Sequence, residues 1–183
     1  MSAPVRRLPG DPRPEEQVAR MIRVDHAGEY GAKRIYAGQL AVLGRRPEVA
    51  ATLRHLEAQE EQHLAAFADL IADRRVRPTA LLGLWHVAGF ALGAATAALG
   101  ERVAMACTAA VEEAIDVHYA HQTAELPETE AKLRARIEAF RAEELAHRHI
   151  ALAHDAERAP GYRLLSAAIK AGCRAAIRLS ERV

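Results

Sequence analysis

The chain has 183 residues, which is enough for one domain with a single hydrophobic core. Half of the residues are hydrophobic but only 4% are aromatic, and the many alanines and leucines favour helices over strands. The 25 basic and 24 acidic residues nearly cancel to a formal charge of +1. This balance argues against a nucleic-acid-binding domain. Cys107 and Cys173 lie outside any CxxC pattern, so we expect inert thiols rather than a disulfide framework or a zinc finger.

Prolines and glycines divide the chain into long segments. Residues 1–14 lack the apolar core of a secretory signal, so we expect a flexible lead-in, with residues 15–183 forming a single domain. Proline suits the first turn of a helix and glycine suits its end. Their positions predict helices at 15–44, 47–74, 79–99, 101–125, 127–157 and 160–181. Short connections make successive helices antiparallel neighbours, which predicts an all-α bundle.

The segment from Thr79 to Gly100 carries no charged residue, and His86 is its only titratable side chain. At about 1.5 Å per residue it could extend about 30 Å, the thickness of a bilayer core. Four glycines and His86 weaken the interpretation as a full span. We expect a helix that lies on or dips into a membrane face, with a buried core helix and a full span as alternatives. The flanking arginines suit anionic headgroups or a solvated surface.

Two Glu-x-x-His motifs each place a carboxylate and an imidazole on one helix face. Their residues are Glu60, His63, Glu144 and His147. On both helices the three-four repeat of apolar residues passes through the first glutamate of the motif, which predicts that both motifs point into the core. The neighbouring Glu61 and Glu143 fall in rows with arginines, so we expect them to be solvated.

Two further glutamates lie on the apolar faces of other helices. They are Glu29 on the first and Glu112 on the fourth, whereas Glu113 shares a row with Asp116 and is expected to point away. Glu29 precedes Glu60 by almost the same interval as Glu112 precedes Glu144. One glutamate from each of two helices plus Glu-x-x-His from each of two others is the di-iron carboxylate arrangement of ferritin-like bundles. Buried carboxylates need such partners, and carboxylate with imidazole favours iron or manganese over zinc.

Other polar residues near these six have two alternative roles. We expect either outer-sphere hydrogen bonds to the ligands or ordinary solvated and core roles for His26, His118, His149, His154, Asp25, Asp116 and Asp155. Tyr119 follows Glu112 along the same face, where it could relay an electron, line a cavity or simply pack. His55 and His121 are expected at the surface.

Several sequence blocks resemble those of the demethoxyubiquinone hydroxylases of ubiquinone biosynthesis. They are RVDHAGEYGAKRIYAGQ around Glu29, RVRPT before the apolar helix, MACTAAVEEA around Glu112, EELAH around Glu144, HDAERAPGY, and the terminal AGCRAAIRLSERV. The resemblance extends from about Arg23 to the C-terminus. Its ligand motifs fall on the same six residues, and it implies that Glu60 and Glu144 bridge the two irons.

The resemblance implies a ferritin-like monooxygenase that uses two ferrous ions and O2 to hydroxylate the ring of a demethoxyubiquinol, the penultimate step of ubiquinone biosynthesis. Electrons would come from NADH or from the quinol itself, and no GxGxxG motif after a strand is visible. A polyprenyl quinol substrate resides in the bilayer, so the apolar helix would serve as its membrane-facing entry.

The resemblance also implies a peripheral position at a membrane surface. The site would be the cytoplasmic side of the bacterial plasma membrane, or the matrix side of the mitochondrial inner membrane in a eukaryote. The excess of arginine over lysine favours a bacterial source. Other ubiquinone-biosynthesis proteins are candidate partners, and exposed apolar surface is a candidate contact between two copies of the chain.

Two other functions use the same features. A ferritin-like iron oxidase or peroxidase would have the same six ligands without an organic substrate, but it would gain nothing from an exposed apolar helix. A metal-free, membrane-associated helical module that binds lipid would need the apolar helix and not the ligands. Metal content separates the second alternative from the other two functions.

Overall fold

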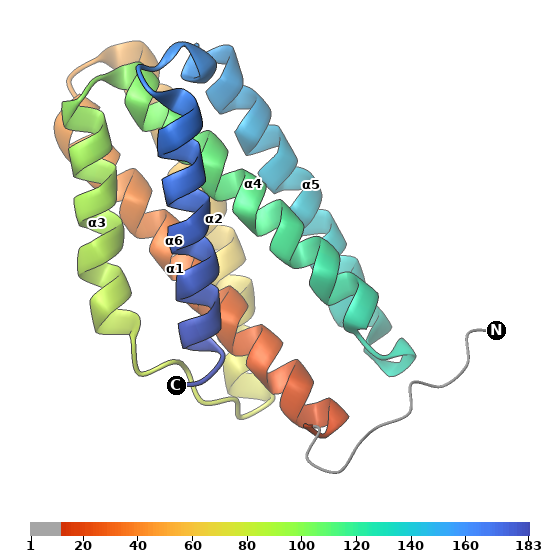
Figure 1. Ribbon diagram of the computed structural model, residues 1–183. Coiled ribbons are helices and arrows are strands. Elements are labelled where there is room, and N and C mark those ends of the chain that lie inside the picture. Colours follow the sequence, from red (N-terminus) through yellow and green to blue (C-terminus); the bar gives the residue numbers. More distant parts are fainter. Residues whose placement is uncertain (1–11) are drawn as a thin grey trace.

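The computed structural model describes residues 12–183, a range with no β-strand and six α-helices (Figure 1). The helices are α1 (Pro14–Leu43), α2 (Pro47–Asp73), α3 (Leu82–Ala98), α4 (Glu101–Glu125), α5 (Ala131–Ala153) and α6 (Tyr162–Ser180). Single 3-10 turns, η1 (Glu128–Glu130) and η2 (Ala156–Arg158), stand on either side of α5. The all-α prediction is confirmed. Residues 1–11 of the expected lead-in lie outside the described residues.

Helix ends follow backbone chemistry that the sequence only partly predicted. The expected helix at 127–157 is shorter at both ends, because the turn η1 precedes it and Asp155 adopts a left-handed conformation with φ of 61°. Gly161, with φ of 69°, similarly delays α6 until Tyr162. Glycine adopts such angles without steric cost, whereas a residue with a side chain, such as Asp155, does so at some expense. Helix α3 also begins three residues later than the predicted position 79.

The helices form a four-helix unit with two covering helices. Helix α1 packs mainly against α2 and α3, and α4 packs mainly against α5 and α6. Figure 1 shows α3 and α6 on the same side of the bundle, in front of α1 and α4. The indole Nε1 of Trp85 on α3 donates to the hydroxyl of Ser180 on α6 at 3.1 Å. Helices α1, α2, α4 and α5 are thereby left to surround the interior where the predicted ligands lie.

Helix α3 lies very close to α1, and glycines make that approach possible. A Cβ on Gly93 would stand 2.0 Å from the carbonyl oxygen of Ile35, and one on Gly38 would stand 2.2 Å from that of Phe90. Gly89 is similarly tight, at 2.8 Å from the carbonyl oxygen of Gly31. Small residues at such contacts let helix backbones meet directly. The glycines that weakened the membrane-span interpretation therefore have a packing role.

The outer face of α3 is exposed and apolar. The exposed fractions are 52% for Leu84, 65% for Val87, 36% for Phe90 and 74% for the following Leu99. The opposite face is buried against α1, so α3 is not the fully buried core helix that was one alternative. Within residues 12–183 no helix has the length and hydrophobicity needed to cross a bilayer. The full-span alternative is wrong because α3 is only 17 residues long.

Candidate metal centre

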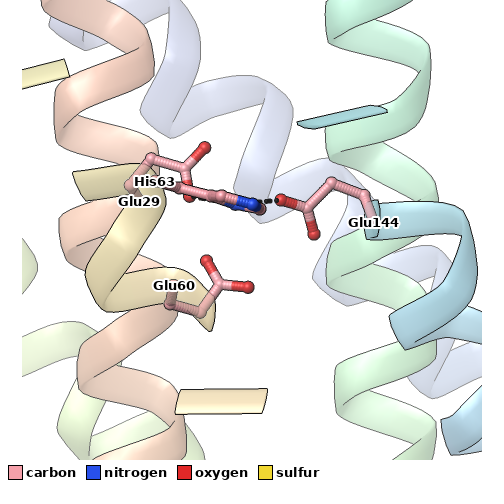
Figure 2. Close-up of side chains that lie close together, drawn as sticks. All are labelled: Glu29, Glu60, His63 and Glu144. Carbon is pink, nitrogen blue, oxygen red and sulfur yellow. Dashed lines mark hydrogen bonds and ion pairs between the residues drawn. The ribbon is translucent and has the colours of Figure 1, made fainter. Parts of the chain in front are cut away.

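Six side chains from four helices meet inside the bundle. Each is at most 1% exposed, and they are Glu29 from α1, Glu60 and His63 from α2, Glu112 from α4, and Glu144 and His147 from α5. Figure 2 shows four of the six, with three carboxylates turned toward a common space and the His63 ring between Glu29 and Glu144. The helical periodicity that selected these residues therefore predicted their burial correctly. Their role as ligands stays a prediction.

The cluster divides into two overlapping groups with metal-binding geometry. The first comprises Glu29, Glu60, His63 and Glu144, and the second comprises Glu60, Glu112, Glu144 and His147. Within each group, one potential ligand atom from every residue lies within 4.8 Å of the others. Glu60 and Glu144 belong to both groups. These two carboxylates are the only shared members of the two groups found among residues 12–183.

Several buried polar atoms of the cluster have no hydrogen-bond partner. Both carboxylate oxygens of Glu60 lack one, as do one oxygen each of Glu29, Glu112 and Glu144, and Nδ1 of His147. Burying a polar atom unpaired costs on the order of 1–3 kcal/mol. Cations that accept these lone pairs would remove that cost. The donor set of four carboxylates and two imidazoles therefore fits a pair of divalent metal ions that accept both oxygen and nitrogen ligands.

Burial and mutual repulsion set the protonation of the four carboxyls. Burial, together with the nearby Glu144 and other carboxylates, raises the pKa of Glu60 and Glu112 well above the ordinary glutamate value, and burial raises the pKa of Glu29. Glu144 behaves oppositely despite its burial, because the close contacts of its carboxylate with the His147 and His63 imidazoles lower its pKa to about 2. The pKa of His63 is raised to about 10, since contacts with Glu144 and Glu29 outweigh desolvation.

We expect the metal-free protein to lose stability as the pH rises from about 5 to 8. Carboxyls with raised pKa values bind more protons in the folded than in the unfolded state, so their stabilising contribution is complete below the unfolded value of 4.5 and is lost as the pH rises toward the folded values. The raised pKa of His63 acts in the same direction above 6.5. Glu144 titrates below this window. Thermal unfolding across the pH range checks the sign.

The control for this prediction is Glu60→Gln, which removes one buried titratable carboxyl while keeping the side-chain shape. Its melting temperature should fall less steeply with pH than that of the wild type. Added Mn²⁺ should also flatten the wild-type profile by stabilising the ionised carboxylates. A metal-free wild-type protein whose melting temperature rises from pH 5 to 8 would contradict this electrostatic interpretation.

A buried tyrosine holds each of the two single glutamates. The Tyr36 hydroxyl of α1 donates to Glu112 of α4 at 2.5 Å, and the Tyr119 hydroxyl of α4 donates to Glu29 of α1. Each tyrosine lies seven residues after the glutamate on its own helix, so the arrangement has an internal twofold pattern. The Tyr119 ring also stacks on Phe67. Sequence reasoning gave Tyr36 no role, although the repeated interval of seven residues was a visible signal.

The outer nitrogens of the two motif histidines have partners that the sequence analysis did not assign. Nε2 of His63 lies 2.8 Å from Oε2 of Glu143, and Nε2 of His147 lies 3.1 Å from Oε1 of Gln59. The expectation that Glu143 is simply solvated is therefore wrong, although its side chain is 44% exposed. Periodicity failed here because a long side chain at the edge of the buried stripe reaches inward across the helix interface.

The other two neighbouring glutamates are where periodicity predicted them. Glu61 is exposed and pairs with Lys33, and Glu113 is about one-third exposed and pairs with Lys170 at 2.7 Å. Neither belongs to the metal-binding groups found in the described part of the chain.

The aspartates considered as partners for the two motif histidines bind other residues instead. Oδ1 of the buried Asp25 lies 3.0 Å from His118 and accepts a hydrogen bond from Gln122 at 2.7 Å. Asp116 accepts from Arg141, and Asp155 from Arg102 and Arg158. The outer-sphere alternative is therefore wrong for all three aspartates, and ordinary structural pairing is correct.

The remaining histidines also lie outside the cluster. His154 contacts Thr52 and Glu101 at the end of the bundle, and His149 is exposed. His26 is half-buried, and its Nδ1 has no hydrogen-bond partner. His55 and His121 are exposed as predicted.

An apolar cavity of about 540 Å³ lies between α1, α3, α4 and α6. Its wall includes Gly28, next in sequence to Glu29, and Val111, next to Glu112, so it borders the two helices that supply the single glutamates. No residue of α2 or α5 lines it. Cys173 is part of the wall, and burial raises its pKa to about 11 and that of Cys107 to about 12. Both thiols are free, and their raised pKa values favour the protonated, less nucleophilic form.

These features define an all-helical bundle with a buried carboxylate–histidine centre suited to a pair of metal ions, next to an apolar cavity. The family model described as "Ubiquinone biosynthesis protein COQ7" matches residues 16–180. The chain belongs to this family. The resemblance to demethoxyubiquinone hydroxylases, drawn from the sequence blocks, is confirmed.

Relatives from bacteria and eukaryotes are similar over nearly the whole chain. A 3-demethoxyubiquinol 3-hydroxylase of Rhodospirillum rubrum is 61% identical over 97% of this chain and 84% of its own length. The human NADPH-dependent 3-demethoxyubiquinone 3-hydroxylase, a mitochondrial protein, is 56% identical over 91% of this chain and 78% of its own length. The mitochondrial 5-demethoxyubiquinone hydroxylase of Saccharomyces cerevisiae is 42% identical over 90% of this chain and 77% of its own length.

Proposed function

We propose that the chain hydroxylates the ring of a demethoxyubiquinol, using O2 and a pair of iron ions held by the six buried residues. Membership of the family makes it a hydroxylating oxidoreductase of ubiquinone biosynthesis. The observation that supports the metal-dependent form of this activity best is the pair of overlapping ligand groups, both fully buried and short of hydrogen-bond partners. Residues 15–183 would then be one ferritin-like domain.

In this proposal Glu60 and Glu144, the members common to the two groups, would help to hold both metal ions. Glu29 with His63 would complete one metal position, and Glu112 with His147 would complete the other. Bound ferrous ions would supply the electrons and the Lewis acidity needed to activate O2. The charges of the four carboxylates match those of two divalent cations, which makes iron compatible with a low-dielectric interior.

The chain's own residues would orient the ligands and the substrate. Tyr36 and Tyr119 each fix one single glutamate by donating to it, leaving the other oxygen free to face a metal ion. The apolar cavity is of a size that accommodates a small ring and would exclude water from the reacting carbon. Because its wall borders α1 and α4 and not α2 or α5, the quinol ring would approach from the side of Glu29 and Glu112.

The cavity and the exposed face of α3 together support a membrane-bound substrate. Helix α3 and helix α6 both line the cavity, and both carry exposed apolar residues, including Leu84 and Val87 on α3 and Leu164 on α6. A polyprenyl tail would remain in the bilayer while its ring enters between these helices. We therefore propose a peripheral position with α3 and α6 against the membrane. In a bacterium this is the cytoplasmic face of the plasma membrane.

Replacing Leu84 with glutamate should release the protein from liposomes. The side chain is half exposed on the apolar face of α3, and a charge there opposes insertion into the acyl region. The matched control is Ala139→Glu on α5, an exposed position on a helix that does not line the cavity. Cosedimentation with vesicles is the measurement. Equal binding by Leu84→Glu and wild-type protein would show that this face does not contact lipid.

The direct test of the function is a product analysis. Full-length protein loaded with ferrous iron would be mixed with ¹⁸O2 and a short-tailed demethoxyubiquinol in detergent, with NADPH, NADH or no added reductant. NADPH is included because the human relative is named for it. We expect a product carrying one ¹⁸O atom, identified by mass spectrometry. Oxygen uptake with iron oxidation, and no labelled quinol under any of the three conditions, would instead indicate an iron oxidase.

A further inference from the structure

The partners of the two motif histidines occupy equivalent positions but differ in charge. Glu143, on Nε2 of His63, immediately precedes the motif glutamate of α5, and Gln59, on Nε2 of His147, immediately precedes that of α2. Each residue therefore reaches from its own helix to the histidine of the opposite motif. The outer nitrogen of His63 therefore contacts a carboxylate, whereas the outer nitrogen of His147 contacts a neutral amide.

On their inner sides the two histidines face the same number of carboxylates, although the His63 ring also stacks on that of Phe140. Both imidazoles turn Nδ1 toward the interior, where His63 Nδ1 lies 3.1 Å from Glu144 and 3.5 Å from Glu29, and His147 Nδ1 lies 3.2 Å from both Glu144 and Glu60. Each histidine shares its group with one single glutamate, and a tyrosine holds that glutamate in both cases. The partner on Nε2 is thus the main charge difference between the two positions.

We propose that Glu143 and Gln59 are positioning residues that make the two metal positions unequal, so that the position of His63 binds a divalent ion more tightly than that of His147. A carboxylate that accepts the outer N–H of a ligating imidazole fixes its orientation and makes the inner nitrogen a stronger donor. A neutral amide oxygen fixes the imidazole less firmly and strengthens its inner nitrogen as a donor less. The inference rests on the proposed metal site and adds an order of filling to it.

The expected size of the difference follows from comparable partners in metalloproteins. Loss of an outer-sphere partner of a ligating histidine costs about 10–100-fold in metal affinity. Because the side chain of Glu143 is 44% exposed and solvent weakens its effect, we expect the lower end, about tenfold. One equivalent of metal would then occupy mainly the His63 position.

The test is anomalous X-ray diffraction from crystals of the full chain grown with one equivalent of Mn²⁺. We expect the stronger anomalous peak beside His63 in the wild type. The double variant Gln59→Glu/Glu143→Gln exchanges the carboxylate and the amide with almost no change in shape, and should move the stronger peak to His147. Glu138→Gln, an exposed residue on α5, is the matched control and should leave the wild-type order.

The possible results separate the inferred order of filling from the metal site itself. Peaks of equal height in the wild type, or the same preference in the double variant, would overturn the inferred order while leaving a two-metal site in place. Absence of any peak in the cluster, even with excess Mn²⁺, would overturn the metal site itself. Anaerobic calorimetric titration of the same proteins with Mn²⁺ gives a second readout, in which Glu143→Gln should weaken the tighter step by about tenfold.

Discussion

Glu60→Ala is expected to abolish hydroxylation and to remove both bound metal ions. Glu60 is fully buried and belongs to both ligand groups, so its loss takes one ligand from each position. Even outer-sphere partners of metal ligands are worth about 10–100-fold, and removal of a shared carboxylate should cost at least the upper end of that range. Turnover of a short-tailed demethoxyubiquinol and metal content after desalting are the two measurements.

The neighbouring Glu61→Ala variant is the matched control. Glu61 has the same side chain one residue further along α2, but it is exposed and pairs with Lys33 at the surface. Surface ion pairs contribute at most about 1 kcal/mol, so this variant should keep nearly all activity and both metal ions. Equal losses from the two substitutions would refute the assignment made from helical periodicity.

Gly93→Ala is expected to cause the largest loss of stability among the Gly→Ala substitutions in α3. The added Cβ would stand 2.0 Å from the carbonyl oxygen of Ile35, a backbone atom that cannot move without separating α3 from α1. Overpacking of this kind costs about 1–3 kcal/mol, and a backbone clash belongs at the upper end. For a domain of this size that lowers the melting temperature by about 6–12 °C.

Gly83→Ala adds the same methyl group to the same helix in open space. Apart from adjoining residues and the backbone of α3 itself, no atom lies within 4 Å of the position that the new Cβ would take. Alanine is the better helix former, so this variant should melt at the wild-type temperature or slightly above it. Scanning calorimetry of the two variants separates the backbone contact from helix propensity. A Gly93→Ala protein as stable as Gly83→Ala would show that α3 and α1 are not in direct contact.

The sequence was sufficient for the elements and the buried cluster because both depend on local spacing. Proline and glycine positions located six helices to within a few residues, and the three-four repeat separated Glu60 from Glu61 and Glu112 from Glu113. These distinctions need only the geometry of a single helix. The predicted ligand set then came from combining the inward faces of four helices, and its metal-binding role stays a prediction.

Contacts between helices were harder to predict from the sequence. The bond from Glu143 to His63 depends on how α5 is rotated against α2, and the bond from Tyr36 to Glu112 depends on how α1 faces α4. Neither rotation is encoded in the spacing on one helix. The pairing of Asp25 with His118 rather than with a histidine of the two Glu-x-x-His motifs has the same cause. The glycines of α3 were likewise interpreted only as an argument against a membrane span. In the structure they allow α3 to approach α1 closely.

The measurement that tests the six-residue metal site most directly is anomalous diffraction at the iron edge from crystals loaded anaerobically with excess Fe²⁺. The proposed site predicts two peaks inside the bundle, both in contact with Glu60 and Glu144. One peak should also contact His63 and Glu29, and the other His147 and Glu112. A single peak elsewhere in the bundle, or no peak within the cluster at saturating iron, would contradict the proposed di-iron centre.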